Sequence, residues 1–112
     1  WTRAKGFDTF CPLGPWIETD FDPAGKHLDS RVSGERRQHA KTNDMIFDIP
    51  TLIEFLSAST ILHPGTVILT GTPHGVGFAR TPPVFLKAGD SVTIEIEKIG
   101  KLTNPVIEEN IG

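Results

Sequence analysis

Glycine and proline recur along the whole chain, and their spacing limits what it can fold into. The 112 residues include eleven glycines and nine prolines, spread between short apolar runs rather than gathered in one tract. Because both residue types interrupt regular structure, this spacing is typical of many short strands joined by turns. The length suits one domain or part of one. The sequence therefore predicts a mainly β fold of the α+β kind with one main helix.

Strand-like patterns occur in residues 16–19, 28–32, 35–39, 66–70, 91–97 and 98–106. Ser33-Gly34 is expected to turn the chain between the second and third of these segments, which makes them a surface hairpin. The run 66–70, TVILT, is β-branched and too short for a helix, so it predicts a buried strand. The alternation in 91–97, SVTIEIE, predicts a strand with one solvated face.

One helix is indicated between residues 50 and 59. Asp48 can accept a hydrogen bond at its N-terminus, and Pro50 stands in the first turn, where a missing N–H is tolerated. Leu52 and Leu56 then recur one turn apart. These signals together predict an amphipathic helix with a defined start.

Composition narrows the classes of partner. The net charge is -3, and no run of like charges exceeds Arg36-Arg37, so neither nucleic acid nor an anionic membrane is indicated as a partner. No apolar run approaches the roughly 20 residues of a membrane span. Cys11 is the one cysteine, which excludes an internal disulfide. We expect it to be a plain buried thiol in a reducing compartment, with the cytoplasm as the default.

The segment KGFDTFCPLGPW, residues 5–16, combines polar side chains with a stiff backbone. Its proline and glycine breaks exclude a regular helix through it. Lys5 suits a cation or general acid beside an anionic substrate, although a solvated surface charge is the commoner use of lysine. Asp8 and Thr9 offer oxygen ligands for an ion, but one carboxylate does not make a metal site.

The segment LTGTPHGVG, residues 69–77, is a glycine-bearing loop at the end of the predicted buried strand. It lacks the Lys-Ser/Thr pair of a phosphate loop and the spacing of a dinucleotide fingerprint. Thr72, between Gly71 and Pro73, can hydrogen-bond a carboxylate or enolate oxygen, whereas the alternative is a tight turn that needs small residues. The four histidines form no close pair, so a histidine metal site is not indicated, and only His74 lies on this loop.

Five segments in order make the chain resemble the C-terminal half of the fumarylacetoacetate hydrolase family. These are KGFDTFCPLGPW, SGERRQ, TNDMIFDIPTLIEFLS, LHPGTVILTGTPHGVG and LKAGDSVTIEIEKIGKLTNPV. The resemblance covers essentially the whole chain. It implies a mixed roll of β-sheets, assembled as a homodimer.

The resemblance also implies an enzyme that acts on a small 2-oxo acid. The activity expected is hydrolysis of a carbon–carbon bond in an acylpyruvate or fumarylpyruvate. The alternatives are an oxaloacetate-type decarboxylase and a 2-hydroxyhepta-2,4-diene-1,7-dioate isomerase. The family uses a divalent ion, Mg²⁺ or Mn²⁺, which grips the 2-oxo carboxylate and stabilises enolate charge.

Residue by residue, the resemblance assigns a catalytic role to Lys5, beside the metal-binding carboxylates of the family. It assigns substrate binding to Thr72 and its neighbour Gly71. Asp8 and Thr9 fall where some family members bind a second ion. In each case the role comes from the matching position in the family's motif.

The metal ligands of the family, a Glu-x-Glu pair and an Asp, have no counterpart before Lys5. The pair Glu95-x-Glu97 lies in a closing strand and does not correspond to them. We therefore expect these ligands upstream, with residues 1–112 forming the C-terminal portion of a single catalytic domain. The rival hypothesis is a non-catalytic fragment or binding module.

Overall fold

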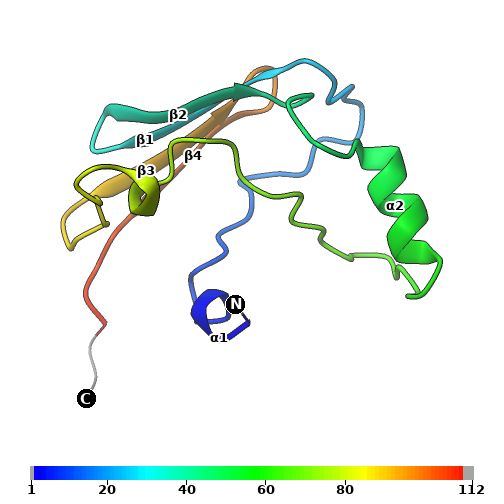
Figure 1. Ribbon diagram of the computed structural model, residues 1–112, viewed down its shortest axis with the longest axis horizontal. Helices are drawn as coiled ribbons and strands as arrows, with labels where there is room; N and C mark the ends of the chain where they lie inside the picture. The colour runs from blue at the N-terminus through cyan, green and yellow to red at the C-terminus, as the bar shows by residue number, and fades with distance from the viewer. Residues whose placement is uncertain (1, 110–112) are drawn as a thin grey trace.

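The computed structural model describes residues 2–109 of the chain. In order, the elements are α1 (Thr2–Lys5), β1 (His27–Val32), β2 (Glu35–Lys41), α2 (Ile49–Ser57), the 3-10 helix η1 (Gly77–Ala79), β3 (Ser91–Ile96) and β4 (Gly100–Pro105). Figure 1 shows the strands side by side in one sheet, with α2 beyond one end of it and α1 to the side of one face. The predicted class, mainly β with one main helix, is confirmed.

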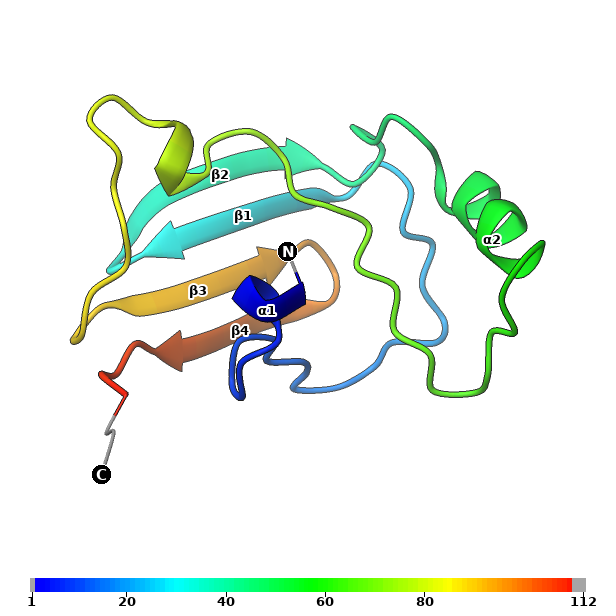
Figure 2. The same ribbon diagram turned by 60° about the horizontal axis from the view of Figure 1, so that its bottom comes forward.

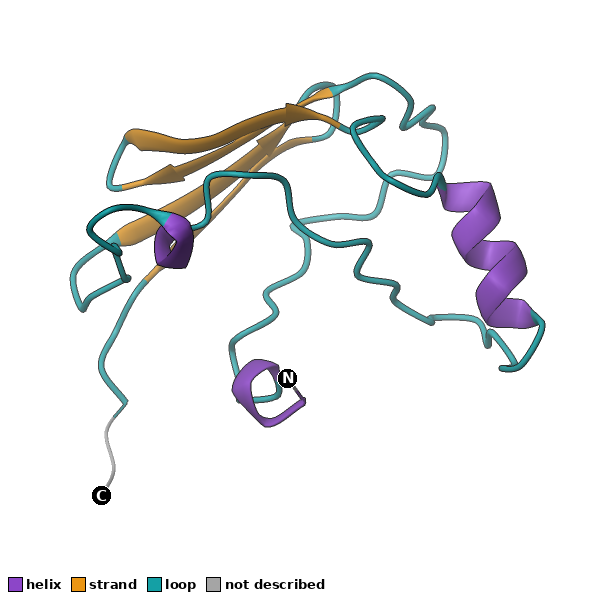
Figure 3. Ribbon diagram, viewed as in Figure 1, coloured by secondary structure: helices purple, strands orange, loops and turns teal. Residues whose placement is uncertain are grey.

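The sheet is antiparallel, with the strand order β2-β1-β3-β4 (Figure 2). In Figure 3 its strands are drawn in orange. β1 and β2 form the predicted hairpin around Ser33 and Gly34, both of which have positive φ. β3 and β4 form a second hairpin and confirm the strands predicted in 91–97 and 98–106. Local turn and alternation signals therefore predicted all four strands of the sheet.

The two faces of the sheet differ in character. Directly opposite residues share a face, so Leu28, Ile94 and Ile96 lie together, whereas Asp29 and Glu95 lie on the other side. The alternation predicted in β3 therefore places apolar and polar side chains on different faces, but the residues of both faces are half-buried, so the predicted difference in solvent exposure is not observed. One face is largely apolar and the other largely polar.

β2 contains a bulge. Ser30 pairs with Gln38 and Arg31 pairs with Arg36, so Arg37 has no residue opposite it on β1. A bulge bends the strand and changes the direction of nearby side chains and carbonyls. β2 is also an edge strand, so this change occurs where another segment can approach.

The helix α2 begins as predicted. The Asp48 side chain accepts a hydrogen bond of 2.9 Å from the backbone N–H of Thr51, and Pro50 stands in the first turn. Hydrogen bonds from Thr51 hold the pKa of the Asp48 carboxyl below its usual range. Across residues 2–109, no helix has the length and apolar character needed to cross a lipid bilayer.

Two predicted strands are not formed. Residues 66–70 and 16–19 belong to none of the four strands, and Val67 and Leu69 are 56% and 73% exposed. A strand requires a hydrogen-bonded neighbour, and the four described strands pair only among themselves. The β-branched composition of TVILT therefore indicated the local preference of the chain but not its partner.

Few side chains are buried within the described chain. Among residues 2–109, only Ala40 and Ser30 are buried, each with 7% of its surface exposed, whereas Ile46 is 94% exposed. The expected burial of Cys11 is wrong, because residues 2–20 are all exposed. The apolar face of the sheet thus has little cover from the chain described.

Candidate functional site

Residues 71–80, here called the Thr72 loop, are attached to β2. Gln38 of β2 donates hydrogen bonds from Nε2 to Oγ1 of Thr72 at 2.9 Å and to the carbonyl oxygen of Pro73 at 2.8 Å. A longer contact of 3.4 Å reaches the carbonyl of His74. In Figure 2 this part of the chain, in yellow-green, runs beside β2. Gln38 therefore joins an edge strand to a loop more than thirty positions away.

Arg80 makes a second connection between the loop and β2, and here the donor is on the loop and the acceptor is on the strand. Its Nη2 donates to the carbonyl oxygen of Arg37 at 2.8 Å and to that of Gly75 at 3.3 Å. Arg37 is the bulged residue, so its carbonyl is oriented away from a regular ladder position. A Cβ at Gly75 would lie 2.5 Å from the Arg37 oxygen, so only glycine permits this approach.

The residue before Thr72 has a positive φ. Gly71 has φ +105°, a conformation that side chains with a Cβ rarely adopt. Thr72 itself is exposed and lies on the wall of a cavity of about 560 Å³. The other walls come from the ends of β1 and β2, residues 44–47 and the start of α2. Gly71 and Thr72 thus line a space large enough for a small acid.

The residues predicted on the opening segment lie elsewhere. Lys5 ends α1, and Lys5, Asp8 and Thr9 are all exposed. None of the three lines the cavity beside Thr72 or the second cavity, of about 480 Å³, that extends along β2. The structure therefore brings Gly71 and Thr72 together with Gln38, but it does not join them to Lys5. The roles assigned to these residues stay predictions.

The described residues do not supply a metal site of their own. Between residues 2 and 109, no group of three or more His, Cys, Asp or Glu side chains is arranged to hold an ion. Asp8 and Thr9 offer two neighbouring oxygen donors at most, whereas Mg²⁺ and Mn²⁺ prefer octahedral oxygen sites. The donor set of this chain alone does not fit the divalent ion that the resemblance implies.

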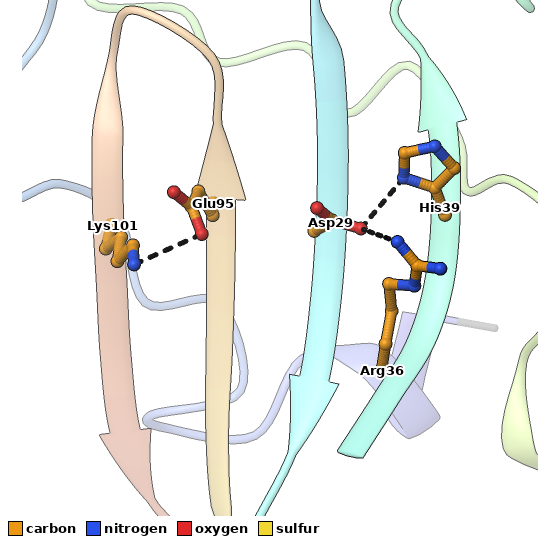
Figure 4. A network of polar contacts seen from close by, with 5 residues as sticks. All are labelled: Asp29, Arg36, His39, Glu95 and Lys101. Atoms are coloured by element: carbon orange, nitrogen blue, oxygen red, sulfur yellow. Dashed lines mark hydrogen bonds and ion pairs between the residues drawn. The ribbon is translucent and has the colours of Figure 1, made fainter. Parts of the chain in front are cut away.

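A second polar cluster lies on the other face of the sheet (Figure 4). The Asp29 carboxylate accepts a hydrogen bond of 2.9 Å from Nδ1 of His39 and lies 3.9 Å from Nη1 of Arg36. The hydrogen bond with His39 and nearby arginine charges hold the pKa of Asp29 below its usual range. Successive residues of a strand point to opposite faces of the sheet, so His39 and Gln38 lie on different faces. This cluster is therefore separate from the Thr72 loop.

Sequence reasoning identified Thr72 but missed Gln38 and Arg80. The signal for Gln38 was a polar, half-buried residue that shares a sheet face with the buried Ala40, because a polar group withdrawn from water needs a partner. No pattern along the chain names that partner. It follows only from the placement of the loop beside β2.

The family model described as fumarylacetoacetate (FAA) hydrolase, C-terminal, matches residues 1–107. Among curated relatives, the mitochondrial oxaloacetate tautomerase fahd2 of Xenopus laevis is 49% identical, in a match that covers 96% of this chain and 34% of the tautomerase. The chain spans about two fifths of the length of the first relatives it matches, 40% and 43%.

Solved structures with similar folds belong to proteins of the same kind. The 5-carboxymethyl-2-hydroxymuconate delta-isomerase of Mycobacterium smegmatis is 52% identical, with a TM-score of 0.88 over 98% of this chain and 41% of its own. The maleylpyruvate hydrolase of Sphingobium sp. SYK-6, in complex with manganese(II) and pyruvate, is 41% identical, with a TM-score of 0.81. That match covers 93% of this chain and 38% of the hydrolase.

Proposed function

The chain belongs to the fumarylacetoacetate hydrolase family, and on that premise we propose that it is the C-terminal portion of a catalytic domain acting on a 2-oxo acid. Two observations support the larger domain. The chain spans about two fifths of its relatives, 40% for the first. Among residues 2–109, only Ala40 and Ser30 are buried, so the apolar face of the sheet is available to pack against further chain.

The proposed reaction is hydrolysis of a carbon–carbon bond in an acylpyruvate, with release of pyruvate. The observation that carries it is the similarity to a maleylpyruvate hydrolase whose structure contains manganese(II) and pyruvate. In this proposal the Thr72 hydroxyl donates a hydrogen bond to the substrate carboxylate. Lys5 supplies positive charge near the enolate oxygen that develops as the bond breaks.

The ligands of the proposed Mg²⁺ or Mn²⁺ would come from acidic residues upstream of this chain. The described residues do not gather a set of ligands, so no step is assigned to the ion here. When bound, such an ion supplies Lewis-acid stabilisation of an oxyanion. Removal of the ion by a chelator is expected to abolish turnover in the complete polypeptide.

A second candidate is an isomerase that interconverts the keto and enol forms of a 2-oxo acid. It is favoured by the 49% identity to an oxaloacetate tautomerase and the 52% identity to a delta-isomerase. Both candidates pass through an enol or enolate of the same substrate class. They differ in whether a carbon–carbon bond breaks, and therefore in whether pyruvate is released.

The domain proposal is tested by the denatured mass of the cellular polypeptide that contains this sequence. We expect a mass roughly 2.5 times that of the 112-residue chain, from its 40% coverage of a relative. The native mass of the same sample tests the predicted homodimer. A polypeptide no larger than this chain would favour the rival hypothesis of a non-catalytic module.

The reaction is tested by incubating the complete polypeptide and Mn²⁺ with an acylpyruvate and, separately, with oxaloacetate. Release of pyruvate from the acylpyruvate supports hydrolysis. Keto–enol exchange of oxaloacetate without release of pyruvate supports the isomerase. Lys5→Ala is expected to lower kcat about 10²- to 10³-fold, the usual loss for one group that stabilises an oxyanion. Lys101→Ala is the matched control, because Lys101 pairs with Glu95 on the polar face of the sheet. Equal turnover in both variants would contradict the role of Lys5.

A further inference from the structure

The amide of Gln38 has a defined orientation. One atom, Nε2, lies 2.8 Å from the carbonyl oxygen of Pro73 and 3.4 Å from that of His74. Carbonyl oxygens only accept hydrogen bonds, so the atom that faces them must be the NH₂ group of the amide. The same NH₂ group lies 2.9 Å from Oγ1 of Thr72.

This orientation determines the role of the Thr72 hydroxyl. The NH₂ group has two hydrogens, and its two short contacts are to Pro73 and Thr72. Thr72 therefore accepts from Gln38, and its own hydrogen is directed to a different acceptor. Thr72 is exposed on the wall of the 560 Å³ cavity, so that acceptor can come from a molecule in the cavity.

We propose that Gln38 is a positioning residue that sets the Thr72 hydroxyl as a hydrogen-bond donor to an anionic oxygen of the substrate. The inference rests on the proposed function, in which a 2-oxo acid carboxylate meets Thr72. A carboxylate accepts hydrogen bonds but donates none. A hydroxyl held as a donor therefore binds it without first breaking a hydrogen bond elsewhere.

The backbone around Thr72 supports this role. Gly71 with φ +105° precedes Thr72, and Pro73, whose φ is restricted by its ring, follows it. Arg80 and Gly75 hold the next residues against the bulge of β2. The backbone is thus held on both sides of Thr72, but the Thr72 hydroxyl could still rotate. The hydrogen bond from Gln38 restricts that rotation.

The test compares Gln38→Glu with Gln38→Met in the complete polypeptide, with pyruvate as the probe. A glutamate can contact Thr72 only by accepting its hydroxyl hydrogen, which turns the hydroxyl away from the cavity. Methionine removes the hydrogen bond but leaves the hydroxyl free to rotate. We expect Gln38→Glu to weaken pyruvate binding and to raise the KM for the acylpyruvate substrate about 10- to 100-fold, the usual range for a hydrogen bond to a charged group. Gln38→Met should have a smaller effect on both quantities.

A double-mutant cycle with Thr72→Val separates positioning from folding. If Gln38 acts through the hydroxyl, Gln38→Met adds no further loss of pyruvate affinity once that hydroxyl is absent. His39→Gln, the next residue on the opposite face, is the control and should leave pyruvate affinity unchanged. Thermal unfolding of each variant checks the fold, and the Gln38→Met cycle decides the matter if Gln38→Glu does not fold.

Two results would overturn this inference alone, and a third would overturn it together with the proposed function. Normal pyruvate affinity in Gln38→Glu, or full additivity with Thr72→Val, would show that Gln38 does not act through the hydroxyl, while the proposed function would stand. Absence of pyruvate binding and of 2-oxo acid turnover in the unmodified polypeptide would overturn both proposals together.

Discussion

The carbonyl oxygen of Arg37, at the bulge of β2, accepts a hydrogen bond of 2.8 Å from Nη2 of Arg80. Arg80 follows η1 and Arg37 belongs to the edge of the sheet, so this bond closes the Thr72 loop at its far end. Gln38 closes it at the near end. The loop is therefore held at two points on adjacent residues of one strand.

Replacement of Arg80 by methionine should loosen the loop while leaving the sheet intact. Methionine keeps much of the side-chain length but cannot donate to the carbonyls of Arg37 and Gly75. We expect faster amide hydrogen exchange across residues 71–80 and little change in β3 and β4. Arg3→Met, at an exposed position in α1, is the control. Unchanged exchange in the loop would show that Arg80 is not needed to hold it.

Gly71→Ala should disturb the site through the backbone. At φ +105° a Cβ introduces strain, for which about 1–3 kcal/mol is typical, and relief of the strain would move Thr72. We expect a lower melting temperature together with weaker pyruvate binding in the complete polypeptide. Gly89→Ala, in a turn with φ +88°, should lower the melting temperature alone. Equal pyruvate affinity in both variants would contradict the link between Gly71 and the site.

Asp29 should contribute to the pH dependence of stability. Its pKa in the folded protein lies below the unfolded value of about 4, because His39 donates to its carboxylate and Arg36 lies nearby. The unfolded chain therefore binds more protons as the pH falls, so the stabilisation is present above about pH 4 and is lost as the pH falls through the folded pKa.

Thermal unfolding between pH 3 and pH 6 measures this effect. Asp29→Asn should flatten the acid limb of the curve relative to the unmodified protein. Glu95→Gln is the control, since the ion pair of Glu95 with Lys101 is more exposed and such pairs contribute little. If Asp29→Asn and the unmodified protein gave parallel curves, the hydrogen bond with His39 would have no linkage to stability.

Leu69 offers a test of the larger domain. Its side chain is 73% exposed in this chain. If upstream chain covers it, Leu69→Ala should lower the free energy of unfolding of the complete polypeptide by about 2–5 kcal/mol, whereas a surface residue would change it by no more than about 0.5 kcal/mol. Chemical unfolding of the complete polypeptide with and without the substitution measures the difference. The smaller effect would mean that Leu69 is a surface residue there too.

The parts of the fold predicted correctly depend on neighbours in sequence. The β1–β2 hairpin follows from its turn residues, and the start of α2 follows from Asp48 and Pro50. The segment 66–70 was predicted wrongly as a buried strand, because its partner cannot be derived from local pattern. The site divides in the same way. Thr72 was identified by its place between Gly71 and Pro73, whereas Gln38 reaches it only through the fold.

The bulge at Arg37 also affects how separate molecules meet. A regular edge strand offers unpaired N–H and C=O groups at which another chain can add, and this is a common route to aggregation. In β2 the regular row is interrupted at Arg37, and the carbonyl of that residue is already bonded to Arg80. The irregularity that supports the Thr72 loop thus also guards this edge of the sheet against unwanted strand addition.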